Sequence, residues 1–352
     1  MTQNFWNKKK VLITGHTGFK GSWLYFILKI LGANVYGVSL KPAKKSLFNN
    51  LNIFRKNKSF YCDITEYKKL NKITKKINPQ IIFHFAAQSL VGKSFSHFDE
   101  TYKTNIIGTL NILKIIKENK NIKTCLITTT DKVYENVEKK KKMYLEYENL
   151  KGNNPYSGSK VAKEHLIFSF VKSFLKKKNI VVVRSGNVIG GGDWNNSRLI
   201  PDMVSSFQKR KKFIVRNLNH TRPWQHIYDV LEVYMKIIKK IHRKKSFFDH
   251  FNVAFHNKNQ KPVREIIRIF KKDNLFKNIK ISKIKIKQYK EDKFLNISNS
   301  KIKKFVNIKS KFNKIDDCII NVINWYKVYL LDMKSIQDYS KKEIIFFLKN
   351  KY

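Results

Sequence analysis

The sequence of 352 residues contains few of the residues that mark several protein classes. Its three cysteines, Cys62, Cys125 and Cys318, stand far apart with no CxxC pair, which excludes a disulfide-rich scaffold and a zinc ribbon and favours a reducing compartment. Only 13 glycines and 6 prolines occur, too few for a collagen-like or low-complexity chain. No apolar run reaches the roughly 18–20 residues that span a bilayer. The polar segment from Met1 to Lys10 predicts no signal peptide.

Acidic residues are scarce as well: 25 stand against 73 lysines and arginines, for a formal net charge of +48. A nucleic-acid-binding protein carries such a charge as a patch with interleaved aromatic residues. Here the lysines recur from Lys8 to Lys351 amid abundant Asn and Ile, which favours compositional drift in an AT-rich genome. We therefore expect no specific nucleic-acid partner, although the positive field would attract anionic ligands.

Short β-branched runs alternate with longer helical patterns through the first half of the chain. Strands are expected at 10–14, 34–40, 59–64, 81–87, 125–130 and 180–186, and helices at 19–31, 66–77, 100–118 and 155–177. This alternation predicts an α/β fold, a Rossmann-type doubly wound parallel sheet with helices on both faces.

After Gly186 the alternation ends, which predicts a smaller C-terminal lobe folded onto the first half. We assign residues 1–186 to the dinucleotide-binding domain and 187–335 mainly to a substrate-binding lobe, with some chain returning to the sheet. The tail at 336–352 has weak periodicity and is expected to fray.

A glycine motif follows the first expected strand and opens the first helix. Gly15, Gly18 and Gly21 form G-x-x-G-x-x-G, in which glycines allow a tight turn and a close approach to a pyrophosphate at the helix N-terminus. The expected cofactor contacts in this motif are Gly15, Thr17, Gly18, Phe19 and Gly21.

The second expected strand ends without the acidic residue that binds the ribose hydroxyls of NAD. Ser39-Leu40-Lys41 stands there, and a lysine near the ribose suits the 2′-phosphate of NADP, so the residues leave the choice of cofactor open. Asp63 and Ile64 end the third strand, where we expect contact with the adenine; a turn or helix-cap role for Asp63 is the alternative.

Tyr156 and Lys160 form a Y-x-x-x-K pair at the start of a long helix. At this spacing the two side chains lie on one helix face. A neighbouring cation stabilises phenolate and lowers the tyrosine pKa from about 10 towards neutrality. Tyr156 is therefore a candidate base for a sugar or alcohol hydroxyl.

With the glycine motif on the first strand and this pair after the fifth, the chain resembles the extended short-chain dehydrogenase/reductase superfamily over nearly its whole length. The resemblance implies a catalytic hydroxyl at Thr130, cofactor contacts at Ala86, Ala87 and Gln88, and a family asparagine at Asn105, grouped here with the cofactor site.

Finer motifs resemble the sugar-nucleotide 4,6-dehydratases, and among them the CDP-glucose branch. These motifs are HTGFKGSWL (16–24), AAQSLV (86–91), GNVIGGGDW (186–194), RLIPD (198–202) and RPWQH (222–226). Thr130-Asp131-Lys132 stands where other dehydratases carry Thr-Asp-Glu, and the CDP-glucose branch also has the lysine.

The resemblance implies an NAD-dependent lyase that converts CDP-glucose to CDP-4-keto-6-deoxyglucose and water by internal hydride transfer, for deoxysugar and polysaccharide synthesis in the cytoplasm. The implied catalytic residues are Thr130, Asp131, Lys132, Tyr156 and Lys160. Asp131 would be the acid for the departing hydroxyl, and Lys132 either the base at C5 or a charge that stabilises the enolate. Substrate contacts are expected at Asn187, Trp194, Arg198, Arg216, Arg222, Trp224 and Gln225.

Several alternatives stay open at the level of sequence. One is an epimerase or reductase for another sugar nucleotide, and a remote one is a nucleic-acid-binding protein on an inactive Rossmann scaffold. The superfamily resemblance also implies a homo-oligomer, a dimer or tetramer, paired through helices near 100–118 and 155–177. No cluster has metal-ligand spacing, so no metal is expected.

Overall fold

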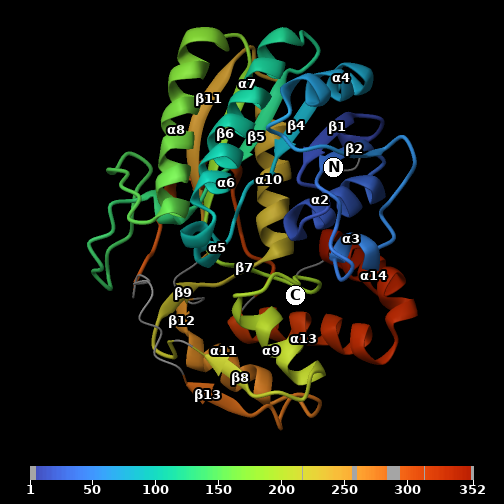
Figure 1. Cartoon of the computed structure of the whole chain (residues 1–352), viewed down its shortest axis with the longest axis vertical. Coiled ribbons are helices and arrows are strands. Elements are labelled where there is room, and N and C mark those ends of the chain that lie inside the picture. Colours follow the sequence, from blue (N-terminus) through green and yellow to red (C-terminus); the bar gives the residue numbers. More distant parts are fainter. Residues whose placement is uncertain (1–4, 216, 256–259, 284–293, 313, 350–352) are drawn as a thin grey trace.

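A seven-stranded parallel sheet lies at the centre of the molecule (Figure 1). The computed structural model describes residues 5–215, 217–255, 260–283, 294–312 and 314–349. In order across the sheet, the strands are β11 (Phe247–Val253), β6 (Asn179–Ser185), β5 (Thr124–Thr128), β4 (Ile81–His84), β1 (Lys10–Thr14), β2 (Asn34–Ser39) and β3 (Ser59–Tyr61). The predicted Rossmann-type α/β fold is confirmed. Because the order reverses beside β1, a crevice opens at the carboxyl ends of the strands.

Helices cover both faces of the sheet, as the buried runs in the strands require. One face packs against α2 (Phe19–Ile30) and α10 (Ile227–Ile241). The other packs against α4 (Tyr67–Ile77), α7 (Gly108–Glu118) and α8 (Pro155–Phe174). Among the described helices, none combines the length and the apolar composition of a membrane span.

The helix expected at 100–118 is divided into three parts. These are α6 (Phe98–Tyr102), the π-helical turn η1 (Lys103–Ile107) and α7, and a further helix, α5 (Val91–Ser96), precedes them. Two other short helices in this half are α3 (Leu47–Asn50) and the 3₁₀ turn η2 (Asp131–Val133). A π-helical turn inserts a residue into the helical repeat, and such turns often occur at functional sites.

The second half builds a lobe below the sheet (Figure 1). It contains β7 (Val188–Ile189), α9 (Leu199–Gln208), β8 (Phe213–Val215), β9 (Thr221–Pro223), β10 (Gln225–His226), β12 (Gln260–Pro262), α11 (Val263–Lys271), β13 (Ile281–Lys283), α13 (Ile315–Leu331) and η4 (Met333–Ser335). α12 (Ser300–Val306) packs instead against β11 and α10. Since β11 and α10 pack with the sheet, the chain returns to the first half. The division at residue 186 stays a prediction.

The tail expected to fray forms a helix instead, α14 (Ile336–Lys349). Ile344 and Phe347 are buried on one face, and the Phe347 ring lies 5.2 Å from that of Tyr228. Trp325 Nε1 donates a hydrogen bond to Ser340 Oγ at 2.9 Å. Tertiary packing of this apolar face, which the weak periodicity did not reveal, accounts for the order.

Candidate active site

The turn after β1 is a close-packed backbone cradle at the N-terminus of α2. Gly15 has a φ of +77°, and a Cβ there would lie 2.7 Å from the backbone nitrogen of Ala86. A Cβ at Gly21 would lie 2.1 Å from the carbonyl oxygen of Gly15. Gly18 caps α2 without a side-chain hydrogen bond, and no acidic residue occupies the first turn. The cradle therefore presents backbone N–H groups and the positive end of the helix dipole to an anion.

A cavity of about 670 Å³ extends from this cradle along the carboxyl ends of the strands. Its volume is within the range of about 300–1,000 Å³ that is usual for ligand sites. The predicted cofactor residues that line it are Gly15, Thr17, Gly18, Phe19, Gly21, Asp63, Ile64, Ala86, Ala87, Gln88, Tyr156 and Lys160. The cradle and this lining fit a dinucleotide.

Asp63 and Lys41 are the residues beyond the cradle that bear on how the ribose and adenine of the cofactor would bind. Asp63 lines the cavity and its Oδ1 also accepts a hydrogen bond from the backbone nitrogen of Thr65 at 2.8 Å, so it caps a turn and faces the site at once. Lys41 is exposed and is not among the residues that line the cavity, whereas Ser39 and Leu40 are. The cation that suggested NADP is therefore placed outside the site.

Asn105 is not a cofactor contact: it is fully buried in η1 and does not line the cavity. Its Nδ2 donates to Ser159 Oγ at 2.8 Å and to the carbonyl oxygen of Gln88 at 3.1 Å, while its Oδ1 accepts from the Gln88 backbone nitrogen at 3.0 Å. The amide thus ties the Gln88 turn to α8, and its partners are all protein groups.

The five predicted catalytic residues lie together on this cavity: Thr130, Asp131, Lys132, Tyr156 and Lys160. The first three follow β5 and the last two open α8, whose capping box at Asn154 fixes the start of the helix. Thr130 Oγ1 hydrogen-bonds to Asp131 Oδ1 at 3.1 Å and to the Tyr156 hydroxyl. Lys160 Nζ lies 5.6 Å from the centre of the Tyr156 ring.

The expected lowering of the Tyr156 pKa is wrong for this structure. Burial raises the pKa of the phenol above its ordinary value, the hydrogen bond with Thr130 lowers it, and the charge of Asp131 raises it. Burial also holds the pKa of Lys160 well below its ordinary value. The ammonium form that was expected to stabilise the phenolate is therefore itself disfavoured.

Four of the predicted substrate contacts line the far part of the cavity: Asn187, Arg198, Arg222 and Trp224. Arg198 Nη1 pairs with Asp193 Oδ2 at 2.8 Å, and Trp224 Nε1 donates to the carbonyl oxygen of Lys261 at 2.9 Å. Two guanidinium groups beside a buried indole suit a diphosphate next to an aromatic base.

Two predicted substrate contacts are not on the cavity. Trp194 donates through Nε1 to Asn50 Oδ1 at 3.0 Å and packs 5.2 Å from the Tyr326 ring, so it joins α3 to α13. Gln225 is fully buried in β10 behind the cavity wall. Both were assigned from motifs that do not reveal which way a side chain points. Arg216 lies outside the described residues.

Lys20 and Asp193 also line the cavity, and sequence reasoning missed them. Burial lowers the pKa of Lys20 to about 8, Arg198 lowers it further, and Asp131 and Asp193 oppose the change. A cation in the first turn of a helix opposes the helix dipole, and this unusual position was a signal in the sequence. No group of three or more metal-ligating side chains is found within the described ranges.

Comparison with known proteins first defines the class. The sequence profile of the NAD dependent epimerase/dehydratase family matches residues 11–254. The chain therefore belongs to this family, and NAD is its cofactor, as the resemblance implied.

Individual relatives narrow the class. The chain is 39% identical over 274 residues to CDP-glucose 4,6-dehydratase from Salmonella typhimurium, covering 75% of this chain and 76% of that protein. It is 30% identical over 247 residues to dTDP-D-glucose 4,6-dehydratase from Dictyostelium discoideum, covering 66% and 56%. The structure of dTDP-glucose 4,6-dehydratase from Bacillus anthracis with NAD superimposes with a TM-score of 0.74 at 22% identity, covering 93% of this chain and 99% of that one. The two sequence relatives are both sugar-nucleotide dehydratases.

One buried lysine near the site is unpaired within the described part of the chain. Lys163, on α8, is 0% exposed and its ammonium has no hydrogen-bond partner there. Burial lowers its pKa to about 7, and Cys125 and Glu164 oppose the change. Because the folded pKa lies below the unfolded value, the charge destabilises the fold fully below pH 7, and the cost declines as the pH rises towards 10.5.

We expect Lys163→Met to stabilise the protein by about 2–4 kcal/mol at pH 6 and by much less at pH 9.5. Urea unfolding at the two pH values measures the difference. Lys172→Met, at an exposed position on the same helix, is the control and should change stability by no more than about 0.5 kcal/mol at either pH. An equal effect of Lys163→Met at both pH values would mean that its charge is not the cause.

Proposed function

We propose that the protein is a CDP-glucose 4,6-dehydratase, which forms CDP-4-keto-6-deoxyglucose and water. The observation that carries the proposal is the placement of Asp131 and Lys132 on the same cavity as Tyr156 and Lys160. A carboxyl group and a second amine beside the tyrosine supply what an elimination needs beyond an oxidation. The similarity to the Salmonella enzyme supports cytidine as the base.

The side chains on the cavity divide the steps of this reaction among them. When bound, NAD would supply a reversible hydride exchange, in which the hydride taken from C4 is returned at C6, so that no external oxidant is consumed. Tyr156 takes the proton of the C4 hydroxyl, and Thr130, hydrogen-bonded to the tyrosine, holds the same oxygen. The resulting 4-ketone makes the C5 proton acidic. Lys132 either takes that proton or stabilises the enolate, Asp131 protonates the hydroxyl that leaves C6 as water, and a proton returns to C5 when C6 is reduced.

The cavity has the charges that an anionic sugar nucleotide requires. Arg198 and Arg222 reach it from the lobe, and Lys20 reaches it from α2. Fork-shaped guanidinium groups bind diphosphate through paired hydrogen bonds, which a neutral sugar would not need. The cradle at one end of the cavity suits the cofactor, and Arg198 and Arg222 at the other end suit the substrate. This arrangement supports a sugar that is held beside the nicotinamide.

An epimerase for another sugar nucleotide is the second candidate, because family relatives include UDP-glucose 4-epimerase from Mycoplasma genitalium, 23% identical over 269 residues. An epimerase would keep Tyr156 and Lys160 but would not use an acid at residue 131. Product mass therefore separates the two reactions.

We expect the purified protein with NAD to convert CDP-glucose to a product lighter by one water, with no stoichiometric release of NADH. Mass spectrometry of parallel reactions with CDP-, UDP-, dTDP- and GDP-hexoses measures both conversion and base preference. Reaction mixtures without protein are the control. A product of unchanged mass would favour the epimerase, and one NADH per turnover would indicate a simple dehydrogenase.

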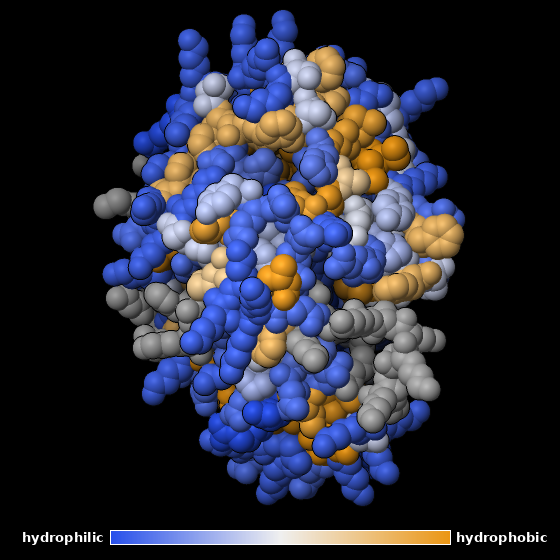
Figure 2. Space-filling model, turned by 90° about the vertical axis from the view of Figure 1, so that its left-hand side faces the viewer, coloured by the Kyte–Doolittle hydropathy of each residue, from blue (hydrophilic) through white to orange (hydrophobic). Residues whose placement is uncertain are grey.

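We also propose a homo-oligomer paired through α6, η1 and α8. Large apolar side chains are exposed on these elements: Phe98, Tyr102, Ile107, Phe168 and Phe174, all at least 40% exposed. Figure 2 shows hydrophobic side chains gathered among hydrophilic ones in the upper half of the side on which α8 lies. A second copy would cover this apolar surface.

The cellular setting is part of the proposal. NAD and nucleotide sugars are metabolites of the cytoplasm, and the three cysteines are free and buried, as suits a reducing compartment. A 4-keto-6-deoxy sugar nucleotide is a precursor for deoxysugars, which supports a role in the synthesis of a surface polysaccharide such as lipopolysaccharide.

A further inference from the structure

Three charged residues of α8 are buried one helical turn apart, directly behind the site. Lys160, Lys163 and Glu164 are 3%, 0% and 2% exposed. At spacings of three and four residues, side chains on a helix are neighbours, about 5–6 Å apart at Cβ. Lys160 lines the cavity, whereas Lys163 and Glu164 do not. The catalytic lysine therefore has a like charge and an opposite charge within one turn, both shielded from water.

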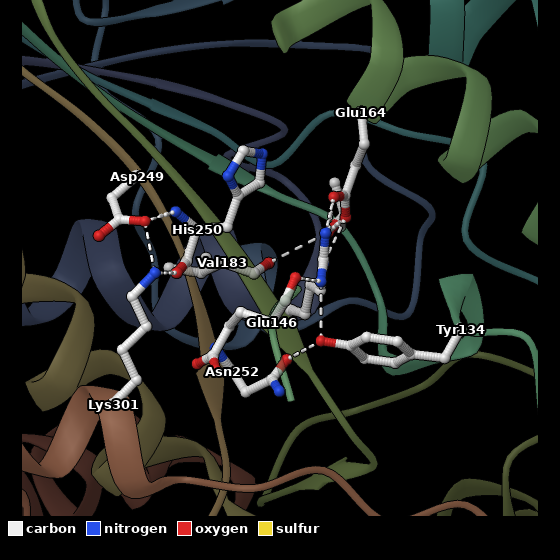
Figure 3. A network of polar contacts seen from close by, with 10 residues as sticks. Tyr134, Glu146, Glu164, Val183, Asp249, His250, Asn252 and Lys301 are labelled. Atoms are coloured by element: carbon white, nitrogen blue, oxygen red, sulfur yellow. Dashed lines mark hydrogen bonds and ion pairs between the residues drawn. The ribbon is translucent and has the colours of Figure 1, made fainter. Parts of the chain in front are cut away.

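Glu164 is held in a single position by its partners. Its carboxylate accepts two hydrogen bonds from Arg184 Nε, both at 3.0 Å, and one from Thr129 Oγ1 at 2.6 Å. Arg184 extends from Glu164 to the Tyr134 hydroxyl at 2.7 Å and to the Glu146 carbonyl oxygen at 3.0 Å (Figure 3). Since Thr129 adjoins Thr130, the carboxylate also joins the end of β5 to the catalytic helix.

Lys163 differs from Glu164 in having no hydrogen-bond partner in the part of the chain that the structure describes. An ammonium that is buried beside another ammonium makes charge on either group less favourable. Other titratable or charged groups bear on the cluster from the packed elements: Lys20 from α2, His84 from β4, Cys125 from β5, Tyr156 from α8 itself, Arg184 from β6 and His250 from β11. Asp131, in η2, acts on Lys20 and Tyr156.

We propose that Glu164 and Lys163 are positioning residues that act as opposed charges and together set whether Lys160 is charged. The carboxylate favours the ammonium form of Lys160, and the unpaired Lys163 disfavours it. The proposal rests on the proposed function in one respect. The charge of Lys160 affects turnover only if Tyr156 takes the proton of the C4 hydroxyl, because a charged Lys160 stabilises the phenolate that does so. The same directions are found in the pKa of Lys160: burial lowers it most, Lys163 and Lys20 lower it further, and Glu164 raises it.

Competitive acetylation of the full chain with acetic anhydride tests the proposal. Mass spectrometry of the Lys160 peptide between pH 6 and pH 11 gives the pH at which this amine becomes reactive. Removing a unit charge about 6 Å away at an effective dielectric constant of about 20 corresponds to a shift of about one to two pH units. Because burial lowers the pKa of Lys163 to about 7, its charge acts on Lys160 mainly below that pH. We therefore expect Lys163→Met to raise the midpoint by up to this amount and Glu164→Gln to lower it.

Tyr134→Phe is the matched control, because it removes a hydrogen bond from Arg184 without changing a charge near Lys160. We expect it to leave the Lys160 midpoint in place. Glu164→Gln leaves Arg184 without its carboxylate partner and is expected to lower Tm. If Glu164→Gln fails to fold, Lys163→Met alone still decides the test. Shifts in the same direction, or no shift in Lys163→Met, would overturn the proposal.

The pH dependence of turnover is the second readout. The alkaline limb, where Lys160 loses its proton, should move up in Lys163→Met and down in Glu164→Gln, which structural damage would not produce. Because acetylation needs no substrate, opposite midpoint shifts in a protein that dehydrates none of the offered sugars would refute the proposed function alone. If the acetylation midpoint of Lys160 shifts but the alkaline limb of the turnover profile does not, the charge of Lys160 does not control turnover.

Discussion

Replacing Tyr156 with phenylalanine is expected to lower turnover of CDP-glucose by about 10²–10⁴-fold, the usual contribution of a general base. The ring volume is kept, and the lost hydroxyl interacts with the Thr130 side chain, so we expect a stability change of no more than about 1.5 kcal/mol. Binding of NAD and of the substrate should be retained. Steady-state kinetics, together with calorimetric titration of both ligands, measures the two effects separately.

Tyr147→Phe is the matched control for this variant. Tyr147 is 83% exposed, is absent from the cavity lining and should tolerate the same change with parent activity. If Tyr156→Phe also turned over at a rate near that of the parent, another group would have to take the C4 proton. Loss of ligand binding in that variant would instead point to a structural role.

Substitution of Lys132 is expected to stop the reaction after the first oxidation. We expect Lys132→Met to lower turnover by about 10²–10⁴-fold and to lose exchange of the C5 hydrogen with deuterated water, while oxidation at C4 still occurs. Lys132 directly follows Asp131 and lines the cavity at the carboxyl end of β5, where such sheets bind ligands. Mass spectrometry of recovered sugar nucleotide measures the exchange.

Lys132→Arg separates the two roles open to this lysine. A guanidinium stays charged at all accessible pH values and cannot act as a base. If Lys132 takes the C5 proton, Lys132→Arg should be as inactive as Lys132→Met; if its charge stabilises the enolate, the arginine variant should keep much of the activity. Exchange at the parent rate in Lys132→Met would exclude it as the base, and Lys20, an amine that interacts with Asp131, would then be tested in the same way.

The sequence was most informative where local pattern and physical need coincide. Alternation of β-branched runs with helical patterns predicted the covered parallel sheet, and the glycines after the first strand form the cradle in which a Cβ at Gly15 or Gly21 would meet backbone atoms. The catalytic residues came from the family resemblance, and the structure brings them together because the end of β5 and the start of α8 meet on one cavity.

Features that depend on side-chain direction were beyond the sequence. Trp194 and Gln225 belong to motifs of the substrate region, yet one packs between helices and the other lies behind the cavity wall. Lys163 is one among 73 basic residues, and only tertiary packing distinguishes it from solvated ones. The helical repeat likewise gave no sign of η1, where a π turn places Asn105 against the Gln88 turn.

The position of β11 at the sheet edge affects how the chain folds during synthesis. All seven residues of β6 are buried, and β11 pairs with them in register from Phe247 to Val253. Until residue 253 has left the ribosome, a nascent chain therefore has an unpaired, apolar strand edge of the kind that associates with other chains. Completion of the central sheet therefore awaits a segment that begins more than 60 residues downstream of β6.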